Sequence, residues 1–200
     1  MTKSWVKQRK KDGYYRKAKA KGYRSRAAYK LIQINEKFSI ITEGDVVVDL
    51  GAAPGGWSQV ALELVGPKGV VIAVDRKRME PIEGVGLVRG DLSNPATMEA
   101  VLEEIEGKVD VVLSDMAPRL SGNKHVDHGK SMSLAESALK FASQTLGRGG
   151  CLVVKVFQGD MFPEYAKRTS KLFESSQSHS PKASTSSSRE TFLVAKGYLG

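Results

Sequence analysis

The chain has 200 residues, of which 40% are hydrophobic, enough for one compact domain and too few for two of ordinary size. Its longest apolar runs are far shorter than the roughly 20 residues that span a bilayer, and its basic N-terminus lacks the apolar stretch of a secretory signal. The single cysteine, Cys151, excludes a disulfide framework and a cysteine zinc site. We therefore expect a cytoplasmic protein without a membrane partner, in which Cys151 is a small buried residue.

The positive charge is concentrated at the start of the chain. Residues 1–30 carry 12 Lys and Arg against one acidic residue, a net charge of +11, whereas the other 170 residues have a net charge of −2. Four aromatic residues are interleaved with these cations: Trp5, Tyr14, Tyr15 and Tyr23. Cations suit phosphate contacts, and rings stack on unpaired bases. We predict an RNA-binding arm at residues 1–24 and one domain at residues 25–200; a solvated tail is the alternative.

From Asp45 onward, short runs of β-branched residues alternate with amphipathic segments. This alternation predicts an α/β domain with a mostly parallel sheet. Strands are expected at residues 46–49, 70–74, 86–89, 109–114, 151–156 and 190–196. Helices are expected at residues 25–38, 58–64, 95–106, 131–146 and 160–173. Ser25 is a candidate cap for the first of these helices.

A glycine-bearing turn follows the first predicted strand, in the segment VVVDLGAAPGGWSQ. Such a turn, leading into a helix, lets backbone N–H groups approach a nucleotide-like ligand. Gly51, Ala53 and Gly56 approximate the G-x-A-x-x-G form of the dinucleotide fingerprint, and Asp75 follows at the spacing of a ribose-binding acid. The turn alone therefore leaves a nicotinamide-dependent oxidoreductase open.

Three acidic residues, Asp75, Asp91 and Asp115, each follow a predicted strand. In an open parallel sheet the ligand lies outside the carboxyl ends of the strands, so the three can converge on the crevice of the glycine turn. Carboxylates suit S-adenosylmethionine, which offers a ribose diol, amines and a sulfonium, and they repel the phosphates of a dinucleotide. We therefore expect S-adenosylmethionine as the cofactor; the alternative is that the aspartates only cap turns or helices.

Two further features have open interpretations. His125, Asp127 and His128 resemble metal ligands, but on one exposed loop we expect them to be polar residues beside the acceptor nucleotide, with no metal bound. Trp57, at a helix start, can pack in the core or contact the adenosine side of the cofactor.

Five segments, SRAAYKL, DLGAAPGGWSQ, SDMAP, VVKVFQG and SRETFLVA, in this order and spacing resemble the FtsJ/RrmJ family of RNA ribose 2′-O-methyltransferases, from Tyr23 to Tyr198. The resemblance implies an α/β, Rossmann-like S-adenosylmethionine-dependent methyltransferase fold: a mostly parallel seven-stranded sheet with helices on both faces, whose last-formed strand is antiparallel. It also implies ribosomal RNA as the partner, with a uridine ribose in the large subunit or its precursor as acceptor and no obligate protein partner. Related branches modify transfer RNA.

The same resemblance assigns residues. It implies a catalytic tetrad of Lys30, Asp115, Lys155 and Glu190. The cofactor contacts that it implies, together with Gly51 of the glycine turn, are Gly55, Trp57, Asp75, Asp91 and Asp115. One departure is residues 175–188, which are dominated by serine where the family has a strand rich in Val and Lys. Composition predicts a flexible loop there, with a strand at residues 173–179 as the alternative.

Methyl transfer from a sulfonium to a ribose oxygen is an in-line displacement that needs alignment and removal of one proton. Lys155 can take that proton only as a neutral amine, a form that burial and the nearby ammonium of Lys30 favour. We assign Asp115 and Glu190 to orientation. The alternatives are an ordinary ion pair at a sheet edge and, for the whole chain, a non-catalytic RNA-binding or ribosome-assembly factor.

Overall fold

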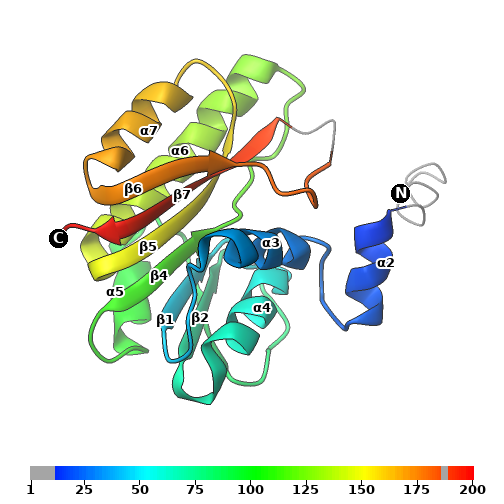
Figure 1. The fold of residues 1–200 in the computed structure, drawn as a ribbon, viewed down its shortest axis with the longest axis vertical. Helices are drawn as coiled ribbons and strands as arrows, with labels where there is room; N and C mark the ends of the chain where they lie inside the picture. Colours follow the sequence, from blue (N-terminus) through cyan, green and yellow to red (C-terminus); the bar gives the residue numbers. More distant parts are fainter. Residues whose placement is uncertain (1–11, 186–188) are drawn as a thin grey trace.

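The computed structural model describes residues 12–185 and 189–200. Within them, seven strands form one sheet in the order β3-β2-β1-β4-β5-β7-β6 (Figure 1). The strands are β1 (Val46–Leu50), β2 (Val70–Asp75), β3 (Val85–Arg89), β4 (Val109–Ser114), β5 (Leu146–Phe157), β6 (Phe173–His179) and β7 (Glu190–Tyr198). β7 is antiparallel to both of its neighbours, β5 and β6, and the remaining neighbours pair in parallel. The predicted fold class is confirmed.

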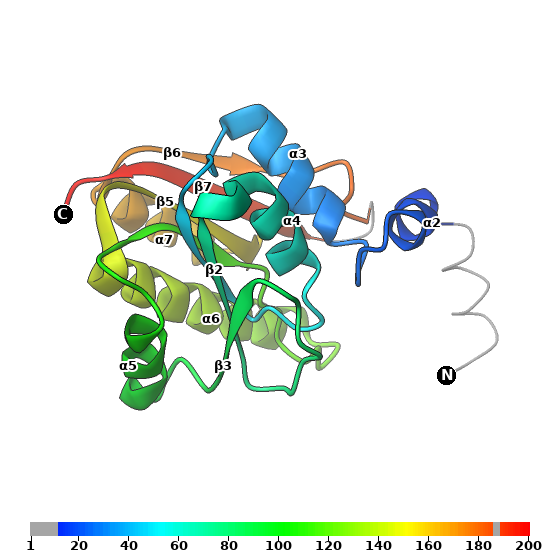
Figure 2. The same cartoon turned by 90° about the horizontal axis from the view of Figure 1, so that it is seen from below.

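Helices cover both faces of the sheet, as Figure 2 shows. They are α2 (Gly13–Ala20), α3 (Ala28–Phe38), α4 (Gly56–Val65), the 3-10 helix η1 (Gly66–Lys68), α5 (Pro95–Glu103), α6 (Lys124–Thr145) and α7 (Phe162–Ser170). On one face α3 and α4 contribute Leu31 and Val60 to a buried apolar cluster. On the other face α6 and α7 contribute Met132 and Tyr165 to a second one. No helix among the described residues is both long and apolar enough to cross a membrane.

The central strand β1 shows why the pattern of the sequence produces this arrangement. Successive side chains of a strand point to opposite faces. Val47 accordingly packs in the cluster under α3 and α4, and Val48 packs in the cluster under α6 and α7. A strand buried on both faces is a continuous run of β-branched residues, as VVVDL is, and this is the usual composition of a parallel sheet.

The chain order reverses between β1 and β4. From β1 the chain winds outward to β2 and β3, and it then returns to place β4 on the other side of β1. Ligands of such open sheets bind outside the carboxyl ends of the strands at this point of reversal. The turn after Leu50 and the turn after Ser114 both lie there, and they carry the predicted site residues Gly51 and Asp115.

Three sequence predictions about elements are wrong. Residues 173–179 form β6, so the loop predicted from composition is wrong there and the strand that the sequence left as the alternative is confirmed. β6 is an edge strand whose backbone pairs with β7 and whose side chains, apart from Phe173, are at least partly exposed, so it needs no apolar residues. The first helix begins at Ala28, and Ser25 does not cap it. The helix expected from residue 131 begins at Lys124, where the Asn123 side chain accepts from two N–H groups.

In the described part of the basic arm, α2 stands beside the main body (Figure 1), and its side chains contact α3 and the segment before it. Asp12 caps α2 and forms an ion pair with Arg26. The Tyr14 ring lies 5.5 Å from that of Tyr29, centroid to centroid. The Tyr23 hydroxyl donates to Glu63 at 2.6 Å, and burial together with that carboxylate raises the pKa of Tyr23 to about 12. Trp5 lies outside the described residues.

Candidate active site

The glycine turn after β1 requires glycine at two positions. Gly51 has φ +74°, and a Cβ atom there would lie 2.3 Å from Cγ of Met116. Gly55 has φ +109°, and a Cβ atom there would lie 2.7 Å from Cδ1 of Ile82. Both conformations are ones that L-residues rarely adopt. The backbone thus passes close to neighbouring side chains and leads directly into α4. The first N–H groups of this helix have no acceptor within the helix.

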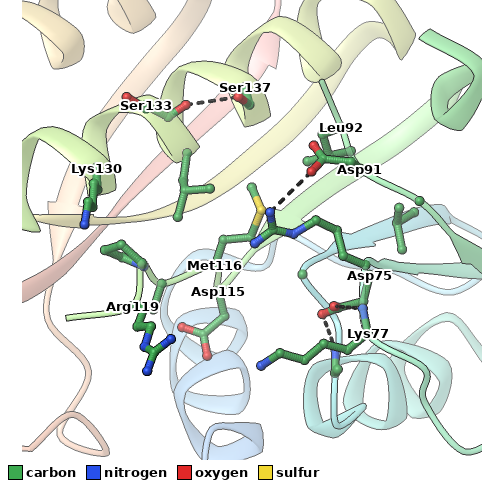
Figure 3. Close-up of a pocket in the computed structure, with 18 residues that line it drawn as sticks. Asp75, Lys77, Asp91, Leu92, Asp115, Met116, Arg119, Lys130, Ser133 and Ser137 are labelled. Atoms are coloured by element: carbon green, nitrogen blue, oxygen red, sulfur yellow. Dashed lines mark hydrogen bonds and ion pairs between the residues drawn. The ribbon is translucent and has the colours of Figure 1, made fainter. Parts of the chain in front are cut away.

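A cavity of about 960 Å³ opens beside this turn, outside the carboxyl ends of β1, β2 and β4 (Figure 3). Four of the predicted cofactor residues line it: Gly51, Asp75, Asp91 and Asp115. Basic side chains of Arg76, Lys77, Arg119 and Lys130 line it as well. The three acids, each placed after a different strand, therefore share one cavity, as their positions in the sequence predicted.

Two of these carboxylates are held in place by the backbone. Asp75 accepts from the N–H groups of Ala53, in the glycine turn, at 3.0 Å and of Lys77 at 2.8 Å. Asp91 accepts from the N–H group of Ser93 at 2.9 Å and from its hydroxyl at 2.8 Å. These bonds, helped by Arg76, hold the pKa of Asp91 below its usual value. Both acids are thus oriented side chains, able to accept from ribose hydroxyls or an amine.

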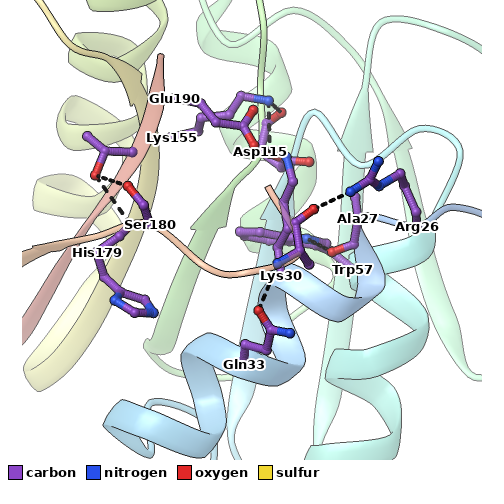
Figure 4. Close-up of polar contacts among 12 residues, drawn as sticks. Arg26, Ala27, Lys30, Gln33, Trp57, Asp115, Lys155, His179, Ser180 and Glu190 are labelled. Carbon is purple, nitrogen blue, oxygen red and sulfur yellow. Dashed lines mark hydrogen bonds and ion pairs between the residues drawn. The ribbon is translucent and has the colours of Figure 1, made fainter. Parts of the chain in front are cut away.

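The four residues of the predicted tetrad come together (Figure 4), and one of them, Asp115, lines this cavity. Lys155 of β5 donates from Nζ to the Asp115 backbone oxygen at 2.5 Å and to Asp115 Oδ1 at 2.8 Å. Lys30 of α3 lies with Nζ 2.5 Å from Glu190 Oε1 and 3.9 Å from Asp115 Oδ1. The side chain of Lys155 is only 6% exposed, and those of Lys30 and Glu190 are 11% exposed. The amino groups of two lysines and two carboxyl groups thus form one largely buried chain of contacts.

The charges in this region perturb two carboxyl groups in opposite directions. Burial favours protonation of Glu190, but the charge and hydrogen bond of Lys30 outweigh it and lower the pKa of Glu190 below its usual value. Asp49 of β1 is 1% exposed, and burial raises its pKa to about 7, against the opposing hydrogen bond from the Ser58 hydroxyl and with the help of the charges of Asp115 and Asp75. Glu190 is thus held ionised, and Asp49 titrates near neutrality.

The remaining cofactor candidates, Gly55 and Trp57, are not among the residues that line the cavity. Trp57 is 3% exposed, its Nε1 donates to the Ala27 carbonyl oxygen at 2.8 Å, and its ring packs on Phe192 with 5.6 Å between centroids. Of the two roles left open for its side chain, the structure gives it core packing. A cofactor contact through the backbone of Gly55 or Trp57 stays a prediction, because neither residue lines the cavity.

The expected polar loop of His125, Asp127 and His128 is instead the first turns of α6, and two of the three are buried. Asp127 accepts from the N–H group and hydroxyl of Ser121, both at 2.7 Å. His128 accepts at Nε2 from the Met161 N–H group, so its Nδ1 carries the proton that is donated to the Phe157 oxygen. The part of the chain that the structure describes contains no grouping of three or more potential metal ligands. Asp127 and His128 thus hydrogen-bond to the segments before and after α6.

Cys151 is buried, as predicted.

Arg24, which the sequence assigned to the RNA-binding arm, contacts the cofactor side of the site. Its guanidinium donates to the carbonyl oxygens of Pro54 at 3.3 Å, Glu80 at 2.5 Å and Pro81 at 2.6 Å. It thereby joins the glycine turn to the segment after β2, which includes Ile82 above Gly55. Nothing in the sequence indicates this role, because every partner is a backbone oxygen.

An α/β domain with a ligand cavity at the point where strand order reverses, and a buried cluster of lysines and carboxylates beside it, defines an enzyme of the nucleotide-binding Rossmann-like class. The chain matches the model of the FtsJ-like methyltransferase family over residues 23–198, and it belongs to that family. This finding confirms the class expected from the five motifs.

The relatives agree with this assignment. The chain is 50% identical to ribosomal RNA large subunit methyltransferase E of Methanothrix thermoacetophila, over 94% of this chain and 73% of that protein. It is 44% identical to the protein of the same name from Methanothermobacter thermautotrophicus, over the whole of this chain and 96% of that protein. A solved structure described as a ribosomal RNA methyltransferase from Plasmodium falciparum matches with a TM-score of 0.80 and 33% identity, covering 89% of this chain and all of that one.

Proposed function

We propose that the protein transfers the methyl group of S-adenosylmethionine to the ribose 2′-hydroxyl of a uridine in large-subunit ribosomal RNA. The observation that carries the proposal is the buried Lys30–Glu190 and Lys155–Asp115 arrangement, in which Asp115 lines the cofactor cavity. The names of the relatives favour ribosomal RNA of the large subunit over transfer RNA as the substrate.

The cavity fits S-adenosylmethionine better than a dinucleotide. A volume of about 960 Å³ is at the upper end of the range for small-molecule sites. The oriented carboxylates of Asp75 and Asp91 can accept hydrogen bonds from ribose hydroxyls and amines, and Asp115 adds a third negative charge. These carboxylates would attract a sulfonium. Because Arg76, Lys77, Arg119 and Lys130 line the same cavity and could attract a pyrophosphate, the choice of S-adenosylmethionine over a dinucleotide also rests on the methyltransferase family of the chain. When bound, the cofactor supplies an electrophilic methyl group.

The contacts of Lys155 support its assignment as the base. A neutral amine has two N–H groups and one lone pair. Because Lys155 Nζ donates to both the backbone oxygen and Oδ1 of Asp115, both N–H groups would be occupied and the lone pair would point away from them. A ribose hydroxyl placed on that side would lose its proton to Lys155 as the oxygen attacks. Lys30 and Glu190 would orient the ribose, and Asp115 would orient Lys155.

The basic arm supplies the RNA contacts in this proposal. Three cations of α2 are exposed: Arg16, Lys17 and Lys19. A row of such cations suits the phosphates of RNA without selecting a sequence. We propose residues 1–24 as a phosphate-binding arm whose anchor is the packing of Tyr14 and Tyr23 on the domain.

Two experiments test the function. Titration with S-adenosylmethionine and, separately, with NAD should show binding of S-adenosylmethionine alone. Binding of NAD alone would favour the alternative function, a nicotinamide-dependent oxidoreductase. Incubation with radiolabelled cofactor and either total ribosomal RNA or transfer RNA should label the large-subunit RNA, and mapping of 2′-O-methylated positions should locate one uridine. Cofactor binding without labelling of any RNA would favour a non-catalytic assembly factor.

A further inference from the structure

A second, smaller cavity of about 220 Å³ has Glu190 of the tetrad in its lining, whereas the cofactor cavity has Asp115. Its lining consists of Gln158, Ser180, Pro181, Ser184, Thr185, Arg189 and Glu190. The two cavities thus share the tetrad between them. Asp115 lines the large cavity, Glu190 lines the small one, and Lys30 contacts both carboxylates at 3.9 and 2.5 Å.

We propose that the small cavity receives the acceptor nucleotide, with an adjacent phosphate of the RNA on Arg189; the proposal rests on the function proposed above. In an in-line displacement the attacking oxygen and the leaving sulfur lie on opposite sides of the methyl carbon. A donor in the large cavity therefore requires an acceptor that approaches the tetrad from another side. The small cavity lies at the carboxyl end of β5 and the start of β7, where Lys155 and Glu190 are also found.

The volume and the lining side chains of the small cavity indicate which kind of ligand it can bind. At about 220 Å³ it is below the roughly 300–1,000 Å³ of ordinary ligand pockets, so it can admit one nucleoside and excludes a duplex. Its side chains are an amide, hydroxyls, an exposed guanidinium and a carboxylate. Arginine is the residue best suited to bind phosphate, and the amide of Gln158 can both donate to and accept from a base edge. An unpaired ribonucleotide satisfies all of these groups.

The wall of this cavity is fixed to the helix that carries Lys30. The N–H group of Ala183 donates to Gln33 Oε1 at 3.0 Å, and Arg26 Nη2 donates to the Ala183 carbonyl oxygen at 2.5 Å. Gln33 and Arg26 flank Lys30 on α3 and its approach, as Figure 4 shows. The Ser180 hydroxyl adds a bond to Thr191 Oγ1 at 3.3 Å. A wall held in this way would fix the position of the acceptor nucleotide relative to the tetrad, as a preorganised site requires.

The test compares two cations of the same segment. Arg189 lines the cavity, whereas Lys182 is exposed and does not line it. Arg189→Ala should raise the KM for the ribosomal RNA fragment that the wild type methylates by roughly tenfold to a hundredfold, the loss of one charge-assisted hydrogen bond. Its kcat and its dissociation constant for S-adenosylmethionine should stay within about threefold of the wild type, and Arg189→Lys should restore part of the loss. Gln158→Ala should raise the KM in the same way by a smaller factor.

Lys182→Ala removes the same charge and should change the KM only through its weak effect on nonspecific RNA binding. The pocket assignment is overturned if Arg189→Ala and Gln158→Ala raise the KM no more than Lys182→Ala does, or if they weaken cofactor binding equally. Wild-type turnover on RNA separates this result from failure of the proposed function. A wild type that binds the cofactor and methylates no RNA would overturn both.

Discussion

The cofactor side and the tetrad side of the active site are built in different ways. On the cofactor side, Asp75 ends its strand and Asp91 follows its own. Their partners are backbone N–H groups two residues away or in the glycine turn, with the Ser93 hydroxyl and Arg76 as further partners of Asp91. On the tetrad side, side chains from four segments far apart in the sequence pair with one another out of water. The difference implies that changes on the first side alter affinity for the cofactor, whereas changes on the second alter the chemical step.

The largest expected effect is that of Lys155→Ala, which removes the proposed base. Methyl transfer should fall by about a thousandfold or more, the upper part of the range for general-base catalysis. The dissociation constant for S-adenosylmethionine should change by less than about threefold, because Lys155 does not line the cofactor cavity. Single-turnover transfer and cofactor titration measure the two quantities.

The control for this change is Lys108→Ala, which removes an exposed lysine just before β4, at the opposite end of that strand from Asp115. Because Lys155→Ala leaves Asp115 without its closest cation, Lys155→Met and a thermal melt check that the loss is not unfolding. Turnover within tenfold of the wild type in a folded Lys155 variant would remove this residue from the mechanism.

The next largest effect is expected on the cofactor side, from Gly51→Ala. The added Cβ atom would lie 2.3 Å from Met116 Cγ, and the backbone there has φ +74°. A left-handed backbone costs an L-residue about 1–2 kcal/mol, so cofactor affinity should fall by roughly tenfold or more. Cofactor titration measures the change.

Two matched variants sharpen this result. Gly129→Ala lies in α6 with no atom within 4 Å of its added Cβ, and it should leave the affinity unchanged. Adding Met116→Ala to Gly51→Ala should recover part of the loss by removing the clash while the backbone strain stays. Normal affinity in Gly51→Ala alone would show that the turn adapts and that glycine is not needed there.

The sequence predicted the cofactor side well because that side is local. A carboxylate that directly follows a strand must lie at the carboxyl end of the sheet, so Asp75, Asp91 and Asp115 could be brought together from spacing alone. The tetrad could not be found in this way, since Lys30 and Glu190 lie 160 residues apart and only the family motifs joined them.

One feature could not be read from the sequence by either route, and a second was left open between a loop and a strand. Arg24 donates to three backbone carbonyl oxygens. Because every residue type has the same carbonyl group, no sequence pattern predicts this contact. β6 has the composition of a loop and becomes a strand because β7 offers it an edge to pair with. In both cases tertiary contacts to the backbone override local composition.

A smaller effect is expected from Arg24→Ala. Loss of the three carbonyl contacts should loosen the glycine turn and weaken S-adenosylmethionine binding by about threefold to tenfold, the equivalent of one hydrogen bond. Arg16→Ala, which removes an exposed arginine of α2, should leave cofactor binding unchanged and weaken RNA binding in a salt-dependent manner. If the two variants behave alike, Arg24 belongs to the RNA-binding arm as the sequence first indicated.

The last effect is on stability and concerns Asp49, which is affected by the charges of both Asp75 and Asp115. Its pKa is raised to about 7 in the folded protein, against an ordinary value near 4 in the unfolded chain. Between these two values the folded state holds a proton that the unfolded state has lost. The free energy of unfolding should therefore fall as pH rises from 4 to 7, by at most about 1.4 kcal/mol per pH unit from this group.

Asp49→Asn removes the titration and keeps an oxygen to accept from the Ser58 hydroxyl. Urea unfolding of both proteins at pH 5, 6, 7 and 8 should give a variant whose stability declines less over this range than that of the wild type. Other titrating groups, such as His179, whose pKa burial lowers, contribute equally to both curves and cancel in the difference. Parallel curves would mean that Asp49 is already ionised at pH 5, and that the buried charge under the glycine turn has a partner in the folded protein.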